Sequence, residues 1–215
     1  RNFKIYLSIC RVGLPSLIRQ GLTSVTMGLL NNTTKPFGDA AIAAMSVVNR
    51  YSNFLICVGL GIGQGFQPVA SFNYQARKYD RVKKGLVFTM CFGLVFIGGF
   101  SVISMICAEG IIGIFQKSEA VIAIGSTALR YTAIGMLFFP FSVPVNMLYQ
   151  SIQQPTISSV LSLIRSGAVT IPMLLIGVPL LGLPGIQIAQ PTADVIAGLL
   201  SIPFIIRFLK KTPAE

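Results

Sequence analysis

Histidine and tryptophan are absent from this chain of 215 residues, and charged residues make up only 11% of it. Histidine is the commonest general base and a frequent metal ligand, so Ser-His-Asp or Cys-His catalysis and histidine-based zinc sites are excluded within the chain. The four cysteines form no Cys-x-x-Cys pair, which favours free thiols packed as small apolar side chains. We expect no catalytic residue, no metal site and no enzyme activity.

A nucleotide-binding signature is also missing. The segment Gly59–Gly63 reads Gly-Leu-Gly-Ile-Gly and does not match Gly-x-Gly-x-x-Gly, and no segment matches Gly-x-x-x-x-Gly-Lys-Ser/Thr. This argues against a pump that binds and hydrolyses ATP by itself, and we expect no bound cofactor.

Long runs without any charged residue are the main feature that is present. They cover Tyr51–Ala76, Gly85–Ala108, Tyr131–Ile164 and Ser166–Ala193, and the shortest has 24 residues. About 20 apolar residues in a helix cross the ~30 Å hydrocarbon core of a bilayer. The sequence therefore predicts an integral membrane protein.

Turn-forming and charged residues divide the apolar sequence into six candidate spans. They are Leu14–Leu30, Ala40–Val69, Gly85–Cys107, Ala120–Tyr149, Ile157–Pro179 and Gly185–Phe208. The short connections leave no room for a soluble catalytic domain. The predicted fold is an all-α membrane protein, a six-transmembrane-helix bundle over residues 14–211. An interfacial basic and apolar segment at 1–13 precedes it, and a cytoplasmic tail at 212–215 follows.

Lysine and arginine outnumber acidic residues 17 to 6, for a net charge of +11. With the N-terminus in the cytoplasm, eleven of the basic residues fall on the cytoplasmic side and two, Lys35 and Lys117, fall outside. The eleven are divided among three segments at the membrane edge, so they form no contiguous surface for nucleic acid. We expect a multi-pass plasma membrane protein, in contact with lipid, with both termini cytoplasmic.

Five charged residues lie inside predicted spans, where each costs roughly 2.5–3.5 kcal/mol if it is central. They are Arg19, Arg50, Arg130, Arg165 and Asp194. Arg19 is near enough to the cytoplasmic end to reach the headgroups, whereas Arg50 and Arg130 lie about ten residues from the outer end and are interpreted as cavity or network residues. Arg165 and Asp194, on neighbouring antiparallel spans, are predicted to form an interhelical ion pair that serves as a structural clamp or in transport.

Uncharged polar residues also gather on one side of the predicted helices. Asn146 and Gln150 belong to a series with three- and four-residue steps, and Asn49 and Asn53 flank Arg50. A dry interior joined by interhelical hydrogen bonds explains these clusters, and so does a water-filled cavity. Both interpretations stay open. We take these five residues, with Gln20 and Arg130, as candidates to face a cavity or substrate.

Several ordered motifs resemble the multidrug and toxic compound extrusion (MATE) family. The string Gly-Gln-Gly-Phe-Gln-Pro at 63–68, with Ser-Phe-Asn-Tyr at 71–74 and the basic loop at 76–84, is similar to the second helix and following loop of a six-helix lobe. The segment 13–20 resembles the start of that lobe. Arg165-Ser-Gly167 resembles its fifth helix, and Gln190-Pro-Thr-Ala-Asp194 its sixth.

The resemblance implies the C-terminal lobe of a twelve-helix, two-lobe transporter whose partner is an N-terminal six-helix lobe of the same chain. It implies an antiporter that exports small cationic drugs or toxins in exchange for H⁺ or Na⁺ by alternating access. In some branches of the family, acidic residues in the first and fourth helices of this lobe are linked to cation coupling. The corresponding helices here offer Gln20 and Arg130, so the resemblance implies that this cation site is absent and that coupling depends on an acidic residue of the N-terminal lobe. Asp194 is the one buried acid that this chain itself offers.

Two other functions remain open at this point. A flippase for lipid-linked precursors, from the same superfamily, would suit the intramembrane arginines because its cargo carries an anionic pyrophosphate. A membrane bundle without transport activity would have a dry, fully packed interior around Asn146, Gln150 and Arg165.

Overall fold

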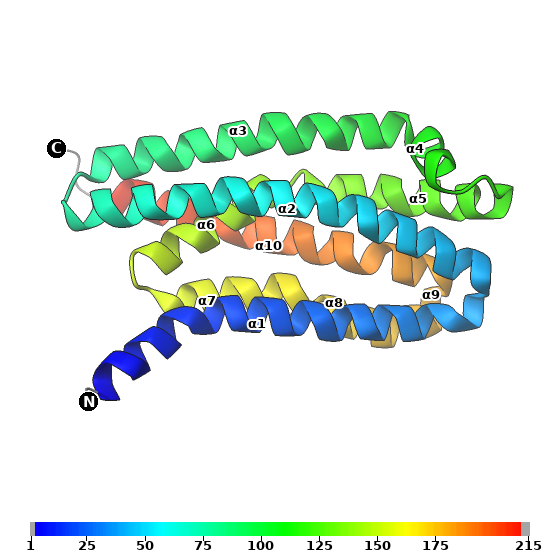
Figure 1. Cartoon of the computed structure of the whole chain (residues 1–215), viewed down its shortest axis with the longest axis horizontal. Coiled ribbons are helices and arrows are strands. Elements are labelled where there is room, and N and C mark those ends of the chain that lie inside the picture. The colour runs from blue at the N-terminus through cyan, green and yellow to red at the C-terminus, as the bar shows by residue number, and fades with distance from the viewer. Residues whose placement is uncertain (1–2, 212–215) are drawn as a thin grey trace.

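A computed structural model describes residues 3–211, and this part of the chain consists of helices joined by short turns (Figure 1). The elements in chain order are α1 (Phe3–Thr34), η1 (Lys35–Phe37), α2 (Asp39–Gln75), α3 (Tyr79–Ile106), α4 (Ala108–Phe115), α5 (Glu119–Met136), α6 (Phe139–Ser151), α7 (Pro155–Leu163), η2 (Ile164–Ala168), α8 (Thr170–Pro172), η3 (Met173–Gly177), α9 (Val178–Leu181) and α10 (Leu183–Lys211). All but α4 and η1 lie along the six predicted spans, and the all-α prediction is confirmed.

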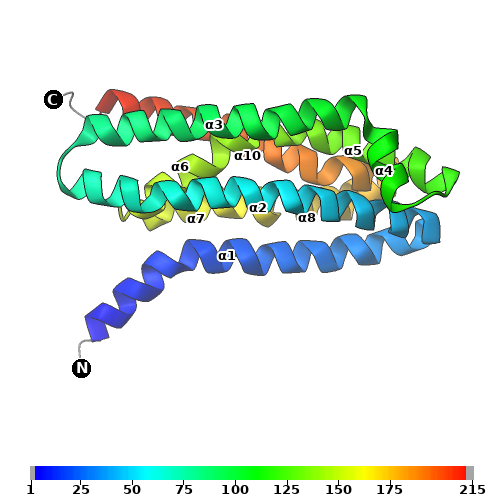
Figure 2. The same cartoon turned by 45° about the horizontal axis from the view of Figure 1, so that its top comes forward.

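Four of the helical segments within the described residues are long and apolar enough to cross a membrane. They are Asp39–Gln75, Tyr79–Ile106, Thr156–Leu181 and Leu183–Lys210. The bent pair α5 and α6 makes a fifth if it counts as one span. Helix α1 is continuous from Phe3, so no break separates the segment predicted to be interfacial from the first span. Figures 1 and 2 show its first turns directed away from the bundle.

The chain reverses direction at positions where glycine or proline fits the backbone. Between α1 and α2, Pro36 lies near the start of η1 and Gly38 follows with φ of 87°. Gly182, with φ of 67°, ends α9 just before α10. Positive φ suits glycine because it has no Cβ. These turns bring consecutive spans into antiparallel order.

The fourth and fifth spans depart from regular α-helix. Helices α5 and α6 meet at a 47° bend, and Pro140, in the first turn of α6, cannot donate a backbone hydrogen bond there. The fifth span contains two π-helical segments, η2 and η3, and such segments occur frequently at functional sites. The prolines of the sequence predicted kinks in general, but no residue signalled the π-helical turns.

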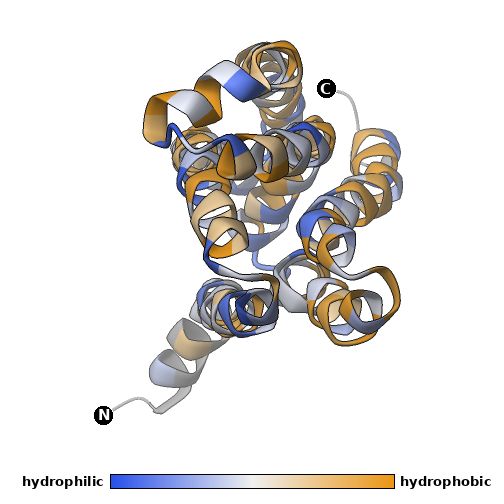
Figure 3. Cartoon of the chain, turned by 90° about the vertical axis from the view of Figure 1, so that its right-hand side faces the viewer, coloured by the Kyte–Doolittle hydropathy of each residue, from blue (hydrophilic) through white to orange (hydrophobic). Residues whose placement is uncertain are grey.

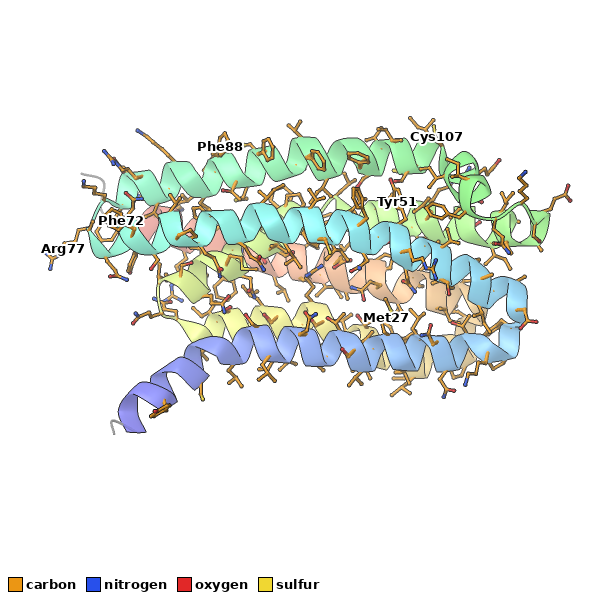
Figure 4. The ribbon with its side chains drawn as sticks, in the orientation of Figure 1. Met27, Tyr51, Phe72, Arg77, Phe88 and Cys107 are labelled. Atoms are coloured by element: carbon orange, nitrogen blue, oxygen red, sulfur yellow. The ribbon has the colours of Figure 1, made fainter. Side chains whose placement is uncertain are left out.

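Small residues allow close contact between helices at several points of the core. A Cβ at Gly135 of α5 would lie 2.8 Å from the Pro191 backbone of α10, and one at Gly198 of α10 would lie 2.6 Å from the Phe138 Cβ. Close approach through small residues is typical of membrane helices. Many large apolar side chains are exposed, and Figure 3 shows apolar residues along the helices of the bundle. Phe88 points outward from α3, while Tyr51 lies between α2 and α3 (Figure 4).

The two ends of the bundle differ in charge. The described ends of the chain lie at the same end as the α2–α3 and α6–α7 turns (Figure 1). Basic residues at this end include Arg77, Lys78, Lys84 and Lys210. Lys35 and Lys117 lie at the opposite end. These described basic residues lie at the ends that the topology prediction assigns to them, and the cytoplasmic assignment of that end stays a prediction.

Candidate functional site

Helix α2 has a buried side and an exposed side along its length. Its buried side carries apolar and small residues, among them Leu55 and Phe66. On the exposed side, Phe54 and Phe72 suit contact with lipid. Beside them runs a stripe that contains the polar residues Arg50, Asn53 and Gln64, here called the polar face of α2. Its members follow three- and four-residue steps and are Arg50, Asn53, Cys57, Gly61, Gln64 and Pro68. Polar side chains at this depth are costly in lipid, so this face is suited to water or to another protein surface.

Helix α1 exposes a similar face. Gln20, Ser24, Met27 and Asn31 recur at steps of four, three and four residues, and all four are exposed. Although α1 and α2 are consecutive, α1 packs mainly against α7 and η2 and touches α2 little. The exposed polar faces thus belong to two consecutive helices, and neither helix covers much of the other. Asn49, half-buried, lies at the edge of the α2 face.

Arg50 is the charged residue of the polar face on α2. It is exposed, and among the described residues no carboxylate lies within ion-pair distance of it. The described acidic residues other than Asp194 lie close to the ends of their helices: Asp39, Asp80, Glu109 and Glu119. The exposed polar faces thus present positive rather than negative charge.

Gln150 joins three helices near the basic end of the bundle. Its Nε2 donates to Ser16 Oγ of α1 at 3.0 Å, and its Oε1 accepts from Gln67 Nε2 of α2 at 3.0 Å. The hydrogen bonds connect α1, α2 and α6 through side chains of all three helices. Gln150 is half-buried. It connects the helices by hydrogen bonds and lies beside the polar faces of α1 and α2.

Asn146 is buried between α6 and α7. Its Nδ2 donates to the Ser158 carbonyl and to Ser162 Oγ, both at 2.8 Å, and its Oδ1 accepts from Ser158 Oγ at 3.1 Å. Beside it, a narrow crevice leaves about 10 Å³ for water, the room of about one molecule. The crevice is lined by Ser142, Val143, Asn146, Met147, Leu161, Ser162, Arg165 and Ser166. Asn146 therefore connects helices and touches a small polar crevice at once.

Arg165 and Asp194 come together in the interior of the bundle. Arg165 Nε lies 3.1 Å from Asp194 Oδ1, and the two side chains are 12% and 3% exposed. The Arg165 guanidinium carbon also lies 4.3 Å from the centroid of the Phe139 ring, a cation–π distance. The Gln190 side chain is within hydrogen-bonding reach of the Asp194 carboxylate. The interhelical ion pair expected from the sequence is thus present in the structure.

Arg130 lies elsewhere than its sequence position suggested. Its Nη2 pairs with Glu109 Oε1 at 3.2 Å, and the two side chains are 49% and 68% exposed. Glu109 lies in the first turn of α4, a helix in what the sequence indicated to be a plain connection. Helix α5 begins at Glu119, farther out along the bundle than the first turn of α4 (Figure 1). Counting residues inward from Glu119 therefore overstates how deep Arg130 lies. Its network partner is an exposed carboxylate of the outer connection.

Several residues that take part in these interhelical contacts were not identified from the sequence. Thr26 Oγ1 of α1 donates to the Ser166 carbonyl of η2 at 2.9 Å, and nothing in the sequence pairs these residues, which are 140 positions apart. Phe139 is one apolar residue among many. Gln190 carried a usable signal, because it precedes Asp194 by four residues and so shares its helix face.

These observations define a helical, multi-pass membrane bundle with exposed polar faces on two of its helices. The MatE family model matches residues 15–176, most of the chain, and the chain belongs to this family. Its members are transporters, not enzymes.

Relatives and solved structures agree with this assignment. Multidrug export protein MepA of Staphylococcus aureus (strain NCTC 8325) is 24% identical over 193 residues, which cover 86% of this chain and 41% of that protein. An outward-facing multidrug resistance MATE family transporter has a TM-score of 0.86 at 22% identity, covering 99% of this chain and 49% of that one. An inward-facing structure gives 0.81 at 22% identity, covering 100% and 51%.

The coverage in these comparisons shows how much of each relative this chain corresponds to. The chain spans less than half the length of the S. aureus relative and about half of the two solved transporters. Its fold is therefore that of one six-helix lobe of a twelve-helix, two-lobe architecture.

Proposed function

We propose that this chain forms one lobe of a secondary active efflux transporter. In this proposal an N-terminal lobe covers the polar faces of α1 and α2, and the two lobes enclose a water-filled cavity. Transport exchanges cationic amphipathic compounds for H⁺ or Na⁺ by alternating access. The observation that carries the proposal is the pair of exposed polar faces, because lipid is a poor environment for Gln20, Arg50 and Asn53.

The comparisons support the alternating-access part of the proposal. The lobe matches one solved transporter named as outward-facing and one named as inward-facing, with TM-scores of 0.86 and 0.81. The fold of the lobe therefore matches a structure named for each of the two conformations. This is expected if the lobes move as units against each other around a fixed site.

Gradient-driven transport in liposomes tests the proposal. The two-lobe transporter that contains this lobe is reconstituted, and efflux of a fluorescent cationic amphipathic dye is followed under an imposed H⁺ or Na⁺ gradient. We expect dye movement against its own gradient in at least one of the two conditions, and none when an ionophore collapses that gradient. Dye movement indifferent to both gradients would rule out the antiporter.

Arg50 favours a second candidate function, a flippase for lipid-linked precursors. An exposed guanidinium with no carboxylate partner among residues 3–211 suits the pyrophosphate of such a cargo, since arginine binds phosphate bidentately. A cationic drug would take its counter-charge from the other lobe. Arg50→Gln, with Arg50→Lys as the control that keeps the charge, separates the two functions. A flippase loses lipid-linked transport with Arg50→Gln, whereas a cation exporter keeps or improves dye efflux.

A further inference from the structure

The buried pair of Arg165 and Asp194 is not explained by stability alone. Asp194 is 3% exposed by its side chain and lies within α10, well away from either end of the helix. Replacing a buried ion pair by apolar residues of similar volume is often neutral or stabilising. An ionisable group kept at such a place therefore points to a function.

Each member of the pair has another interaction that persists if the pair separates. The Arg165 guanidinium carbon lies 4.3 Å from the Phe139 ring centroid. The Gln190 amide is within reach of Asp194, and Gln190 Oε1 accepts from Thr170 Oγ1 at 3.4 Å. Arg165 is the charged group that acts on Asp194. When the pair separates, the cation can thus rest on the ring while Gln190 stays beside the Asp194 carboxyl group.

The backbone next to Arg165 connects the pair to α1. Arg165 belongs to the π-helical segment η2, and the carbonyl of the next residue, Ser166, accepts from Thr26 Oγ1 of α1. Gly167 packs closely against Leu22, also on α1. A shift of η2 is therefore transmitted to the helix that carries the exposed face with Gln20.

A narrow crevice reaches the arginine of the pair. Arg165 lines it together with the polar residues Ser142, Asn146 and Ser162 and with apolar side chains, and the crevice has room for about one water molecule. Water that enters between α6 and α7 can therefore reach the guanidinium that pairs with the Asp194 carboxylate.

We propose that Asp194 is a proton-binding site of this lobe, and that proton binding releases Arg165 and lets η2 and α1 move. The proposal rests on the proposed function. In the step itself, water delivers a proton along the crevice, an O–H bond forms on the Asp194 carboxylate, and the ion pair becomes neutral acid and free cation. Arg165 keeps its proton throughout. Loss of the proton to the other side of the membrane restores the pair.

The test compares three variants of the full two-lobe transporter in liposomes. Asp194→Asn removes the acid but leaves a buried cation, so Arg165→Gln with Asp194→Asn is added as a variant that removes both charges and is better able to fold. Glu109→Gln is the matched control, because it breaks the exposed ion pair instead. The readouts are dye binding, dye accumulation driven by a pH gradient, and protons moved per dye.

We expect the double variant to bind dye and to let it equilibrate, but to lose accumulation driven by the pH gradient, with one proton fewer moved per cycle. Glu109→Gln should behave like the wild type. Unchanged proton-driven accumulation in the double variant would overturn the proposal. Wild-type transport driven by Na⁺ and indifferent to the pH gradient would overturn it too, while leaving the antiporter intact.

A spectroscopic readout keeps the proposal testable if no transport is found at all, an outcome that would count against the proposed function alone. Infrared difference spectra between acid and neutral pH report the protonation of buried carboxyl groups. A carboxyl band present in the wild type and in Glu109→Gln, and lost in the double variant, supports proton binding at Asp194. Its absence from the wild type refutes it.

Discussion

The two ion pairs of this lobe have nearly the same geometry and very different surroundings. Arg165 and Asp194 are 3.1 Å apart, and Arg130 and Glu109 are 3.2 Å apart. The first pair is 12% and 3% exposed, the second 49% and 68%. Interatomic distance thus says little about what a pair contributes. Desolvation decides it, because a buried charge without its partner is costly and an exposed one is solvated by water.

The largest expected effect comes from breaking the buried pair on one side. Asp194→Asn leaves the Arg165 guanidinium buried without a counter-charge, and we expect the free energy of unfolding to fall by about 3–5 kcal/mol. Denaturation of the purified protein in detergent, followed by circular dichroism, measures this. A loss under about 1 kcal/mol would mean that the Phe139 ring alone satisfies the cation.

Removing both charges of the buried pair should cost much less. For Arg165→Gln with Asp194→Asn, we expect a loss of about 1 kcal/mol relative to the wild type, since no unpaired charge remains. The double variant should therefore be more stable than Asp194→Asn in the same denaturation assay. Simple addition of the two single effects would contradict the coupling of the pair.

The hydrogen bond between α1 and η2 is expected to contribute less again. Thr26→Val keeps the shape of a buried side chain but removes the donor to the Ser166 carbonyl, and we expect about 0.6 kcal/mol of lost stability. Thr26→Ser keeps the hydroxyl and serves as the control. Equal losses in the two variants would assign the effect to packing and not to the hydrogen bond.

The smallest effect is expected at the exposed pair. Glu109→Gln should change the free energy of unfolding by about 0.2–1 kcal/mol at low salt, and by less at high salt, because exposed pairs are solvated and screened. Denaturation at two ionic strengths measures both parts. A salt-independent loss as large as that of Asp194→Asn would show that this pair is buried in the assembled protein.

The sequence predicted the all-helical fold because charge-free runs and turn residues reflect the cost of placing charge in lipid. It predicted the partner of Arg165 for a related reason: neighbouring antiparallel spans limit which acid a buried cation can reach. It did not predict the partner of Arg130, since α4 is a short helix in a segment that looks like a loop. Nor did it choose between cavity and hydrogen-bond network for Gln150, which depends on Ser16 and Gln67 in distant parts of the chain.

Each π-helical turn in the fifth span corresponds to about one extra residue in the chain. A π turn accommodates about one more residue than an α turn that joins the same contacts, and one residue rotates a helix by about 100°. Deleting one residue at η2 or η3 would let this span become a more regular α-helix. The deletion would also rotate Arg165, or the residues beyond it, away from their present partners. Relatives aligned over this span are therefore expected to differ by single-residue gaps at these two positions.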